Sequence, residues 1–321
     1  MSKNRVYWLD ICRSLAIICV VLCHSLEAVY SLDLEHMQFI NMQLKLFIYI
    51  MFTIGRLGVP LFLFISGYLL LMDGEMYDSI KCVVFWKKKL LRLLMTTEIW
   101  IIIYNVFLWW YTNNISISTL IFNMTFLKFV DLSHMWYMPM ILGIYLFIPF
   151  LAKLLEAFSK KIWIFIACII FIYSYGGVFL DIIVRARGGD SLNYLSPIFI
   201  GDYFGLYLIL GYLVKKDIFK NIKFRNLVCI GVLSFGSTVA VQVFACVNNL
   251  EYKLWYNFPF LLICSLTIFI ALSRYENTTK IKKHIIWDDI SQCAFGIYLV
   301  HNVILSIIRK YINMEIFAYD R

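Results

Sequence analysis

Long apolar segments separated by short polar stretches dominate the chain. A helix needs about 20 apolar residues to cross the hydrocarbon core of a bilayer. A membrane-spanning β-strand instead alternates apolar and polar residues over about ten positions, and this chain lacks such alternation. The pattern therefore predicts an all-α integral membrane protein, a polytopic bundle of about ten transmembrane helices.

The predicted spans follow the apolar stretches. They cover residues 8–31, 45–72, 90–111, 135–152, 162–180, 198–214, 227–247, 254–273 and 289–310. A tenth stretch, 117–131, is apolar but short, so it either spans, re-enters or lies along the interface. No linker, low-complexity run or internal repeat interrupts the chain, which predicts a single domain over residues 1–321.

Charged residues at the ends of the first spans predict the orientation. Lys3 and Arg5 precede the first span, the loop after it is acidic at 33–35, and the following loop is basic at 87–92. By the positive-inside rule, the N-terminus lies in the cytoplasm. The first span shows no small-residue cleavage site, so we interpret it as a membrane helix and not as a signal peptide. The side of the C-terminus depends on whether 117–131 crosses.

The composition excludes several functional classes. Hydrophobic residues make up 62% of the chain and charged residues 15%, against about 25% in a soluble domain. The net charge of +9 is explained by basic loops at anionic lipid, so nucleic acid is not an expected partner. Nine cysteines without a C-x-x-C pair indicate neither a disulfide framework nor a metal site. The absence of a Walker motif argues against an ATP-driven pump.

Arg13 and His24 are the most informative pair, because ionisable residues inside a membrane segment are costly. They lie eleven residues apart in the first predicted span, which on a helix is about three turns, or roughly 16 Å along nearly one face. A guanidinium suits phosphate, and an imidazole suits proton transfer. The spacing matches an acyl-coenzyme A that rests its phosphates near Arg13 and its thioester near His24. A proton pathway in a transporter remains an alternative use of His24.

Other charged residues extend this candidate site. Asp10 lies three residues before Arg13, so a local ion pair is the simpler interpretation of both. Arg56 follows Gly55 and precedes Gly58 and Pro60; it is a candidate anion contact, while the small residues also favour close helix packing.

The basic run after the second predicted span supplies two more candidates. Lys89 and Arg92 lie three residues apart on one helical face and are candidates for holding phosphates at the cytoplasmic surface, whereas the rest of the run is interpreted as a lipid anchor. His134, Trp136, Tyr298 and His301 are further accessory candidates, two of them histidines in apolar surroundings.

Four stretches, in this order, resemble the family-3 membrane acyltransferases, also called the acyltransferase 3 family. The first is Leu9-Asp-x-x-Arg13 with His24 following at the Arg-x10-His spacing. The second is Gly58-Val-Pro-Leu-Phe-Leu-Phe-Ile-Ser-Gly-Tyr-Leu69. His134-Met-Trp-Tyr137 and Ser291-Gln-Cys-Ala-Phe-Gly-Ile-Tyr-Leu-Val-His301 complete the set.

The resemblance implies a bundle of about ten helices that moves an acyl group, commonly acetyl, from cytoplasmic acyl-coenzyme A to a hydroxyl of an extracytoplasmic glycan or other cell-envelope acceptor. It implies His24 as the catalytic histidine and Arg13 as its partner. From the residues themselves we expect Arg13, Lys89 and Arg92 to hold the coenzyme A phosphates, with Arg56 assisting, and we expect no metal. The family often carries an Arg-x-x-Arg pair where this chain has Lys89-Leu-Leu-Arg92.

A second resemblance supplies the rival hypothesis. Membrane-bound serine racemases of vancomycin-resistant bacteria carry a similar membrane domain before a racemase domain. On that analogy this chain is the N-terminal membrane half of a longer protein and moves a substrate such as L-serine across the membrane. The break at residues 54–60 fits a transporter, although transporters often show two such breaks in paired repeats and this sequence has one.

Overall fold

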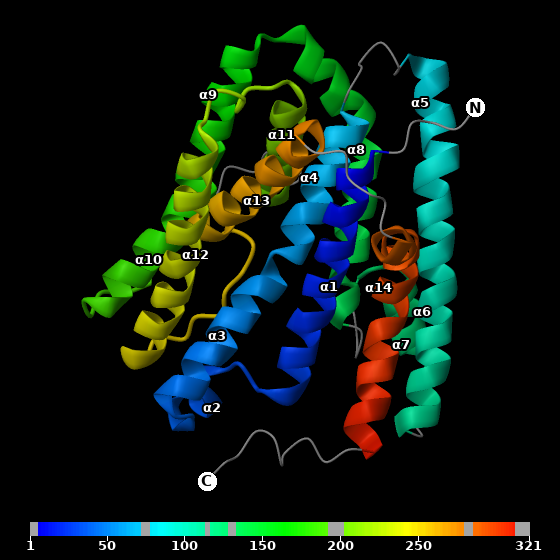
Figure 1. The fold of residues 1–321 in the computed structure, drawn as a ribbon. Coiled ribbons are helices and arrows are strands. Elements are labelled where there is room, and N and C mark those ends of the chain that lie inside the picture. The colour runs from blue at the N-terminus through cyan, green and yellow to red at the C-terminus, as the bar shows by residue number, and fades with distance from the viewer. Residues whose placement is uncertain are drawn as a thin grey trace.

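The computed structural model describes residues 6–71, 78–112, 116–127, 133–191, 202–278 and 285–311. Within these ranges every regular element is a helix (Figure 1). The prediction of an all-α protein is therefore confirmed.

The helices follow one another with short connections. They are α1 (Tyr7–Val29), α2 (Leu34–Phe39), α3 (Met42–Arg56), α4 (Gly58–Leu70), α5 (Ser79–Phe85), η2 (Trp86–Leu90), α6 (Leu91–Thr112), α7 (Ile117–Met124), η3 (Ser133–Trp136), α8 (Tyr137–Ala157), α9 (Lys160–Ile170), η4 (Phe171–Tyr175), α10 (Gly176–Ala186), α11 (Asp202–Lys215), α12 (Phe224–Val247), α13 (Pro259–Thr278) and α14 (Ile285–Tyr311). Several neighbours join into longer spans, because α3 continues into α4 and α5 continues through η2 into α6.

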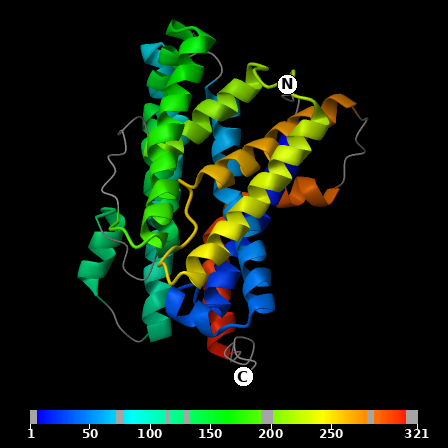
Figure 2. The ribbon, with the colours of Figure 1, turned by 90° about the vertical axis from the view of Figure 1, so that its left-hand side faces the viewer.

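Seven helices of the described chain are long and apolar enough to cross a membrane. They are Tyr7–Val29, Met42–Leu70, Ser79–Thr112, His134–Ala157, Lys160–Ala186, Phe224–Val247 and Ile286–Tyr311. Tyr203–Lys215 and Pro259–Arg274 are shorter apolar helices. The multi-pass prediction is supported, but the predicted number of about ten spans is not confirmed. The ambiguous stretch 117–131 contains the eight-residue helix α7, too short to cross, at the edge of the molecule in Figure 2.

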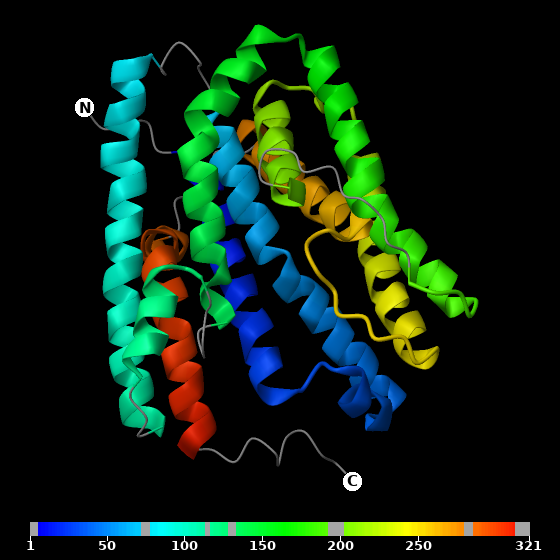
Figure 3. The same cartoon turned by 180° about the vertical axis from the view of Figure 1, so that it is seen from behind.

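Helix α1 lies inside the bundle, between α14 on one side and α3 with α4 on the other (Figures 1 and 3). Two glycines allow this close packing. A Cβ atom at Gly55 would lie 2.8 Å from the backbone of Cys23, and one at Gly58 would lie 2.6 Å from the carbonyl oxygen of Ala16. Small residues permit helix backbones to approach within a membrane, so the segment 54–60 serves helix packing.

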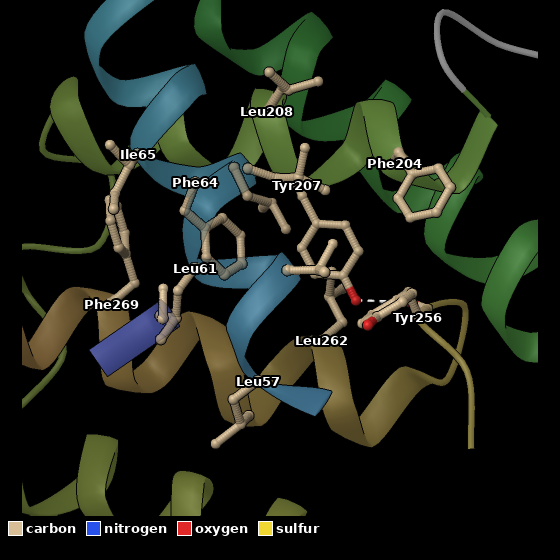
Figure 4. Packing of buried hydrophobic residues seen from close by; sticks show 14 of the residues in the cluster. Leu57, Leu61, Phe64, Ile65, Phe204, Tyr207, Leu208, Tyr256, Leu262 and Phe269 are labelled. Carbon is tan, nitrogen blue, oxygen red and sulfur yellow. Dashed lines mark hydrogen bonds between the residues drawn. The ribbon is translucent and has the colours of Figure 1, made fainter. Parts of the chain in front are cut away.

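Helix α4 makes a similar contact on its other side with α11. A Cβ atom at Gly67 would collide with the carbonyl oxygen of Leu208. Figure 4 shows Phe64 beside Tyr207 and Phe269, with ring centroids 5.3 and 5.2 Å from that of Phe64. The Tyr207 hydroxyl donates to the carbonyl oxygen of Tyr256 at 2.6 Å, which fixes the loop before α13 against this core.

Basic residues gather at one end of the bundle, the upper end in Figure 1. Lys160 Nζ donates to the carbonyl oxygen of Lys216 at 3.2 Å, which places the start of α9 at the end of α11. The Arg274 guanidinium of α13 donates to the carbonyl oxygens of Phe219 and Ile222, in the turn before α12. The bundle therefore has a lysine- and arginine-rich end, at which α1 also begins.

Candidate active site

One cavity of about 410 Å³ extends along α1 and contains most of the predicted site residues. Its walls come from α1, α4, η2 with α6, η3 with α8, the loop before α13, and α14. The lining residues are Arg13, Val20, Cys23, His24, Val59, Phe62, Ile65, Ser66, Leu69, Leu70, Lys89, Leu93, His134, Trp136, Tyr137, Met138, Ile141, Tyr145, Tyr256, Ser291, Gln292, Ala294, Phe295 and Tyr298. Asp10, Arg56, Arg92 and His301 lie outside this lining set.

Arg13 and His24 both face this cavity from α1, as their spacing predicts. The straight helix places them about three turns apart, so the cavity is roughly 16 Å long between the two side chains. Both Lys89 of η2 and Arg92 of α6 are exposed, but only Lys89 lines this cavity. Lys89 and Arg92 were predicted to act together. The structure places only Lys89 in the cavity that Arg13 lines.

The predicted local ion pair of Arg13 is present. Its Nη1 donates to Asp10 Oδ1 at 3.0 Å, and Ser291 of α14 donates to the same oxygen at 2.8 Å. Asp10 is buried, while the Arg13 side chain is 32% exposed. A guanidinium has five N–H donors, so the contact with Asp10 holds Arg13 in place and leaves other donors for a ligand anion.

Glu27 is a member of the site that the sequence analysis missed. His24 Nδ1 lies 2.9 Å from Glu27 Oε2, one turn further along α1. The other carboxylate oxygen, Oε1, accepts from Arg56 Nη2 at 3.1 Å and from Lys253 Nζ at 2.9 Å. The spacing of three residues between His24 and Glu27 was the available signal.

Arg56 is buried beside this pair. Its Nη1 donates to the Tyr256 hydroxyl at 3.1 Å, and its guanidinium carbon lies 4.7 Å from the Phe52 ring centroid and 4.9 Å from that of Trp255. Such stacking on aromatic faces suits a guanidinium. In this structure the anion that Arg56 contacts is therefore the Glu27 carboxylate.

A family comparison identifies the kind of protein to which this site belongs. A family model described as an acyltransferase domain matches residues 6–318. The chain belongs to the acyltransferase 3 family. It is a multi-pass membrane acyltransferase. Neither the curated proteins nor the solved structures give a match.

The acyltransferase gathers three histidines at the level of His24. The ring centroids of His24 and His301 are 5.1 Å apart, and those of His301 and His134 are 5.8 Å apart. His301 Nδ1 lies 2.6 Å from the carbonyl oxygen of Tyr298, and the Tyr298 hydroxyl donates to the carbonyl oxygen of His134 at 3.1 Å. The predicted accessory residues are thus close neighbours, although 164 positions separate Tyr298 from His134.

Trp136 closes the cavity of the acyltransferase with other aromatic rings. Its centroid lies 5.6 Å from that of Phe204, 5.1 Å from Trp255 and 5.6 Å from Tyr256. Burying aromatic surface in this way stabilises the wall of the cavity beside Arg56. Across the described residues, no group of three or more histidine, cysteine, aspartate or glutamate side chains is arranged to hold a metal ion.

Proposed function

We propose that this acyltransferase moves an acyl group, acetyl in the simplest case, from cytoplasmic acyl-coenzyme A to a hydroxyl of an extracytoplasmic glycan or other cell-envelope acceptor. The observation that carries the proposal is that a single cavity is lined by the cations Arg13 and Lys89 and by His24, which lies about three helical turns from Arg13. This distance suits a donor whose charged phosphates and reactive thioester are separated by a long, flexible arm.

The cationic side chains of the cavity support a phosphate-bearing donor. Arg13 and Lys89 supply charge-assisted donors, and exposed Arg92 lies one turn beyond Lys89 at the basic end of the bundle. The rest of the lining is mainly apolar, with polar groups from Ser66, Ser291, Gln292 and several tyrosines. Such a channel favours an uncharged arm over a second charged group.

His24 is suited to act as the general base. Because a carboxylate only accepts hydrogen bonds, His24 donates Nδ1–H to Glu27, and its Nε2 keeps a lone pair. The acceptor hydroxyl gives its proton to Nε2 while its oxygen forms a bond to the thioester carbonyl carbon. When the intermediate collapses, the C–S bond breaks and the coenzyme A thiolate takes the proton back from His24. The products are an ester and free coenzyme A, and His24 is restored.

The distribution of charge supports a cytoplasmic N-terminus. The start of α1, the start of α9 and the end of α11 share the basic end of the bundle, and cytoplasmic loops carry an excess of lysine and arginine. The helix α7 is too short to reverse this arrangement. On this orientation, coenzyme A enters near Arg13 and the acceptor approaches His24 from the other side.

The test measures transfer of a radiolabelled acetyl group by protein purified into nanodiscs, with acetyl-coenzyme A as donor and total cell-envelope glycan as acceptor. Thioester hydrolysis without acceptor is the simpler readout. We expect His24→Ala to abolish both activities, while His36→Ala, at an exposed histidine of α2, retains them. Full activity of His24→Ala would overturn the assignment. Uptake of labelled serine into proteoliposomes without coenzyme A would favour the transport alternative.

A further inference from the structure

We infer that His134 is a second catalytic residue, whose Nε2–H stabilises the oxyanion formed when the thioester carbonyl is attacked. The inference rests on the proposed acyl transfer and adds the group that stabilises its transition state. Three observations carry it: the hydrogen bond at Nδ1 of His134, the unpaired Nε2 atom, and the place of the ring in the cavity.

The hydrogen bond at Nδ1 fixes where the imidazole carries its proton. Asn302 Nδ2 lies 2.8 Å from His134 Nδ1. An amide nitrogen can only donate, so Nδ1 accepts and a neutral His134 ring carries its proton on Nε2. His24 has the opposite arrangement, with the proton on Nδ1 and the lone pair on Nε2. The cavity thus contains one imidazole that accepts a proton and another that donates a hydrogen bond.

The Nε2–H group of His134 has no partner within the described chain. His134 is buried, with 4% of its surface exposed, and its Nε2 atom is inaccessible and forms no hydrogen bond. A buried donor without a partner costs about 1–3 kcal/mol, so such groups in native sites call for a specific role. Because His134 lines the cavity, the partner inferred for its Nε2–H is an oxygen of the substrate bound there.

Neighbouring groups hold the His134 ring in place. Tyr298 donates to its carbonyl oxygen at 3.1 Å, and the Tyr104 ring centroid lies 4.8 Å from the imidazole centroid. His301 lies between the two cavity histidines, with centroids 5.1 Å from His24 and 5.8 Å from His134. Preorganised donors near developing charge are most effective when they need not reorient during the reaction.

These positions define the step in which His134 acts. The acceptor oxygen bonds to the carbonyl carbon, its proton passes to His24 Nε2, and the carbonyl π electrons move to oxygen. The resulting oxyanion accepts a hydrogen bond from His134 Nε2–H. On collapse these electrons re-form the C=O bond and the C–S bond breaks. His134 donates a hydrogen bond throughout and neither gains nor loses a proton.

Two substitutions isolate this hydrogen bond. His134→Phe keeps a planar ring but removes the donor, whereas the amide nitrogen of His134→Gln reaches the region of Nε2. His134→Phe removes the acceptor of Asn302 together with the Nε2–H donor, whereas the glutamine amide supplies a donor again, so activity recovered in His134→Gln reports that donor. We expect His134→Phe to lower kcat by about 10²–10³-fold with the KM for acetyl-coenzyme A changed less than about threefold, and His134→Gln to recover about tenfold of that loss. His36→Gln is the matched control, because His36 is exposed.

The outcomes separate this inference from the proposed function. Wild-type protein without acetyl transfer would contradict the proposed function itself. Wild-type transfer that depends on His24, combined with undiminished kcat in His134→Phe, would overturn only the role of His134. Equal loss in the Phe and Gln variants, with lowered thermal stability and weakened coenzyme A binding in both, would assign His134 a structural role and would also overturn the inference.

Discussion

Glu27 Oε2 lies 2.9 Å from His24 Nδ1, within one turn of α1. This contact fixes the imidazole of the candidate base, because it determines both the ring orientation and the nitrogen that carries the proton. Arg56 and Lys253 in turn bind the other oxygen of Glu27. His24 is therefore part of a larger network that reaches α3 and the loop before α13.

Glu27→Gln tests the orientation of His24. The amide keeps the size of the side chain but removes the charge, and it can present an N–H group to Nδ1. We expect kcat for acetyl transfer to fall by about 10²-fold, with little change in KM for acetyl-coenzyme A, because general-base catalysis typically contributes 10²–10⁴-fold. Glu251→Gln, at an exposed glutamate, is the control. Unchanged kcat in Glu27→Gln would remove Glu27 from the mechanism.

Arg56→Met tests whether Arg56 supports Glu27. The substitution leaves Glu27 bound to Lys253 but removes a buried ion pair, so we expect a loss of about 2 kcal/mol in the free energy of unfolding and a lower kcat. Thermal unfolding in detergent and transfer kinetics measure both effects. In the double variant with Glu27→Gln, the two losses in kcat are expected to be smaller than additive. Additive losses would show that the two residues act independently.

Arg13→Ala tests the binding of the donor phosphates. Charge-assisted hydrogen bonds contribute about 1.5–3 kcal/mol, so the Kd for coenzyme A is expected to rise by about 10–100-fold. Lys89→Ala is expected to weaken binding in the same direction, whereas Lys88→Ala is the control because Lys88 lies outside the cavity lining. Isothermal titration with coenzyme A in nanodiscs gives the constants. Equal affinity in wild type and Arg13→Ala would place the phosphates elsewhere.

Gly58→Ala tests the close packing of α4 on α1. The added methyl group would lie 2.6 Å from the Ala16 carbonyl oxygen, so one helix has to shift, at a cost of about 1–3 kcal/mol. We expect a lower Tm in detergent and reduced activity, since His24 lies on the displaced α1. Gly143→Ala in α8 is the matched control, because a Cβ there has no atom within 4 Å. A wild-type Tm for Gly58→Ala would contradict the packing role.

Some features of the site could be predicted from local sequence because they depend on a single helix. Helix geometry fixes the relation of Arg13 to His24, and of Arg13 to Asp10, and both relations are found in α1. The helical membrane class could also be predicted locally, because the apolar segments are long enough for helices to cross a bilayer. The site residues on other helices could not be identified from the first span alone. The ordered motifs in those segments, which resemble the acyltransferase 3 family, pointed to them.

Other features of the fold and the site could not be predicted from local sequence. The break beside Arg56 was compatible with a ligand site or with packing, and only the approach of α3 and α4 to α1 decided the matter. The predicted number of about ten spans is not confirmed, since some apolar stretches form helices shorter than a full span that lie tilted inside the bundle. Hydropathy records how apolar a segment is but not how its helix is placed.

The sequence by itself determined that this is a helical membrane protein with Arg13 and His24 on one face, because the period of the helix and the thickness of the bilayer are local constraints. Only the tertiary structure decided which groups surround them. Glu27 acquires its cations from Arg56 and Lys253, and His134 acquires its tautomer from Asn302, through contacts between distant segments. Such contacts depend on how whole helices pack, which no local pattern of residues specifies.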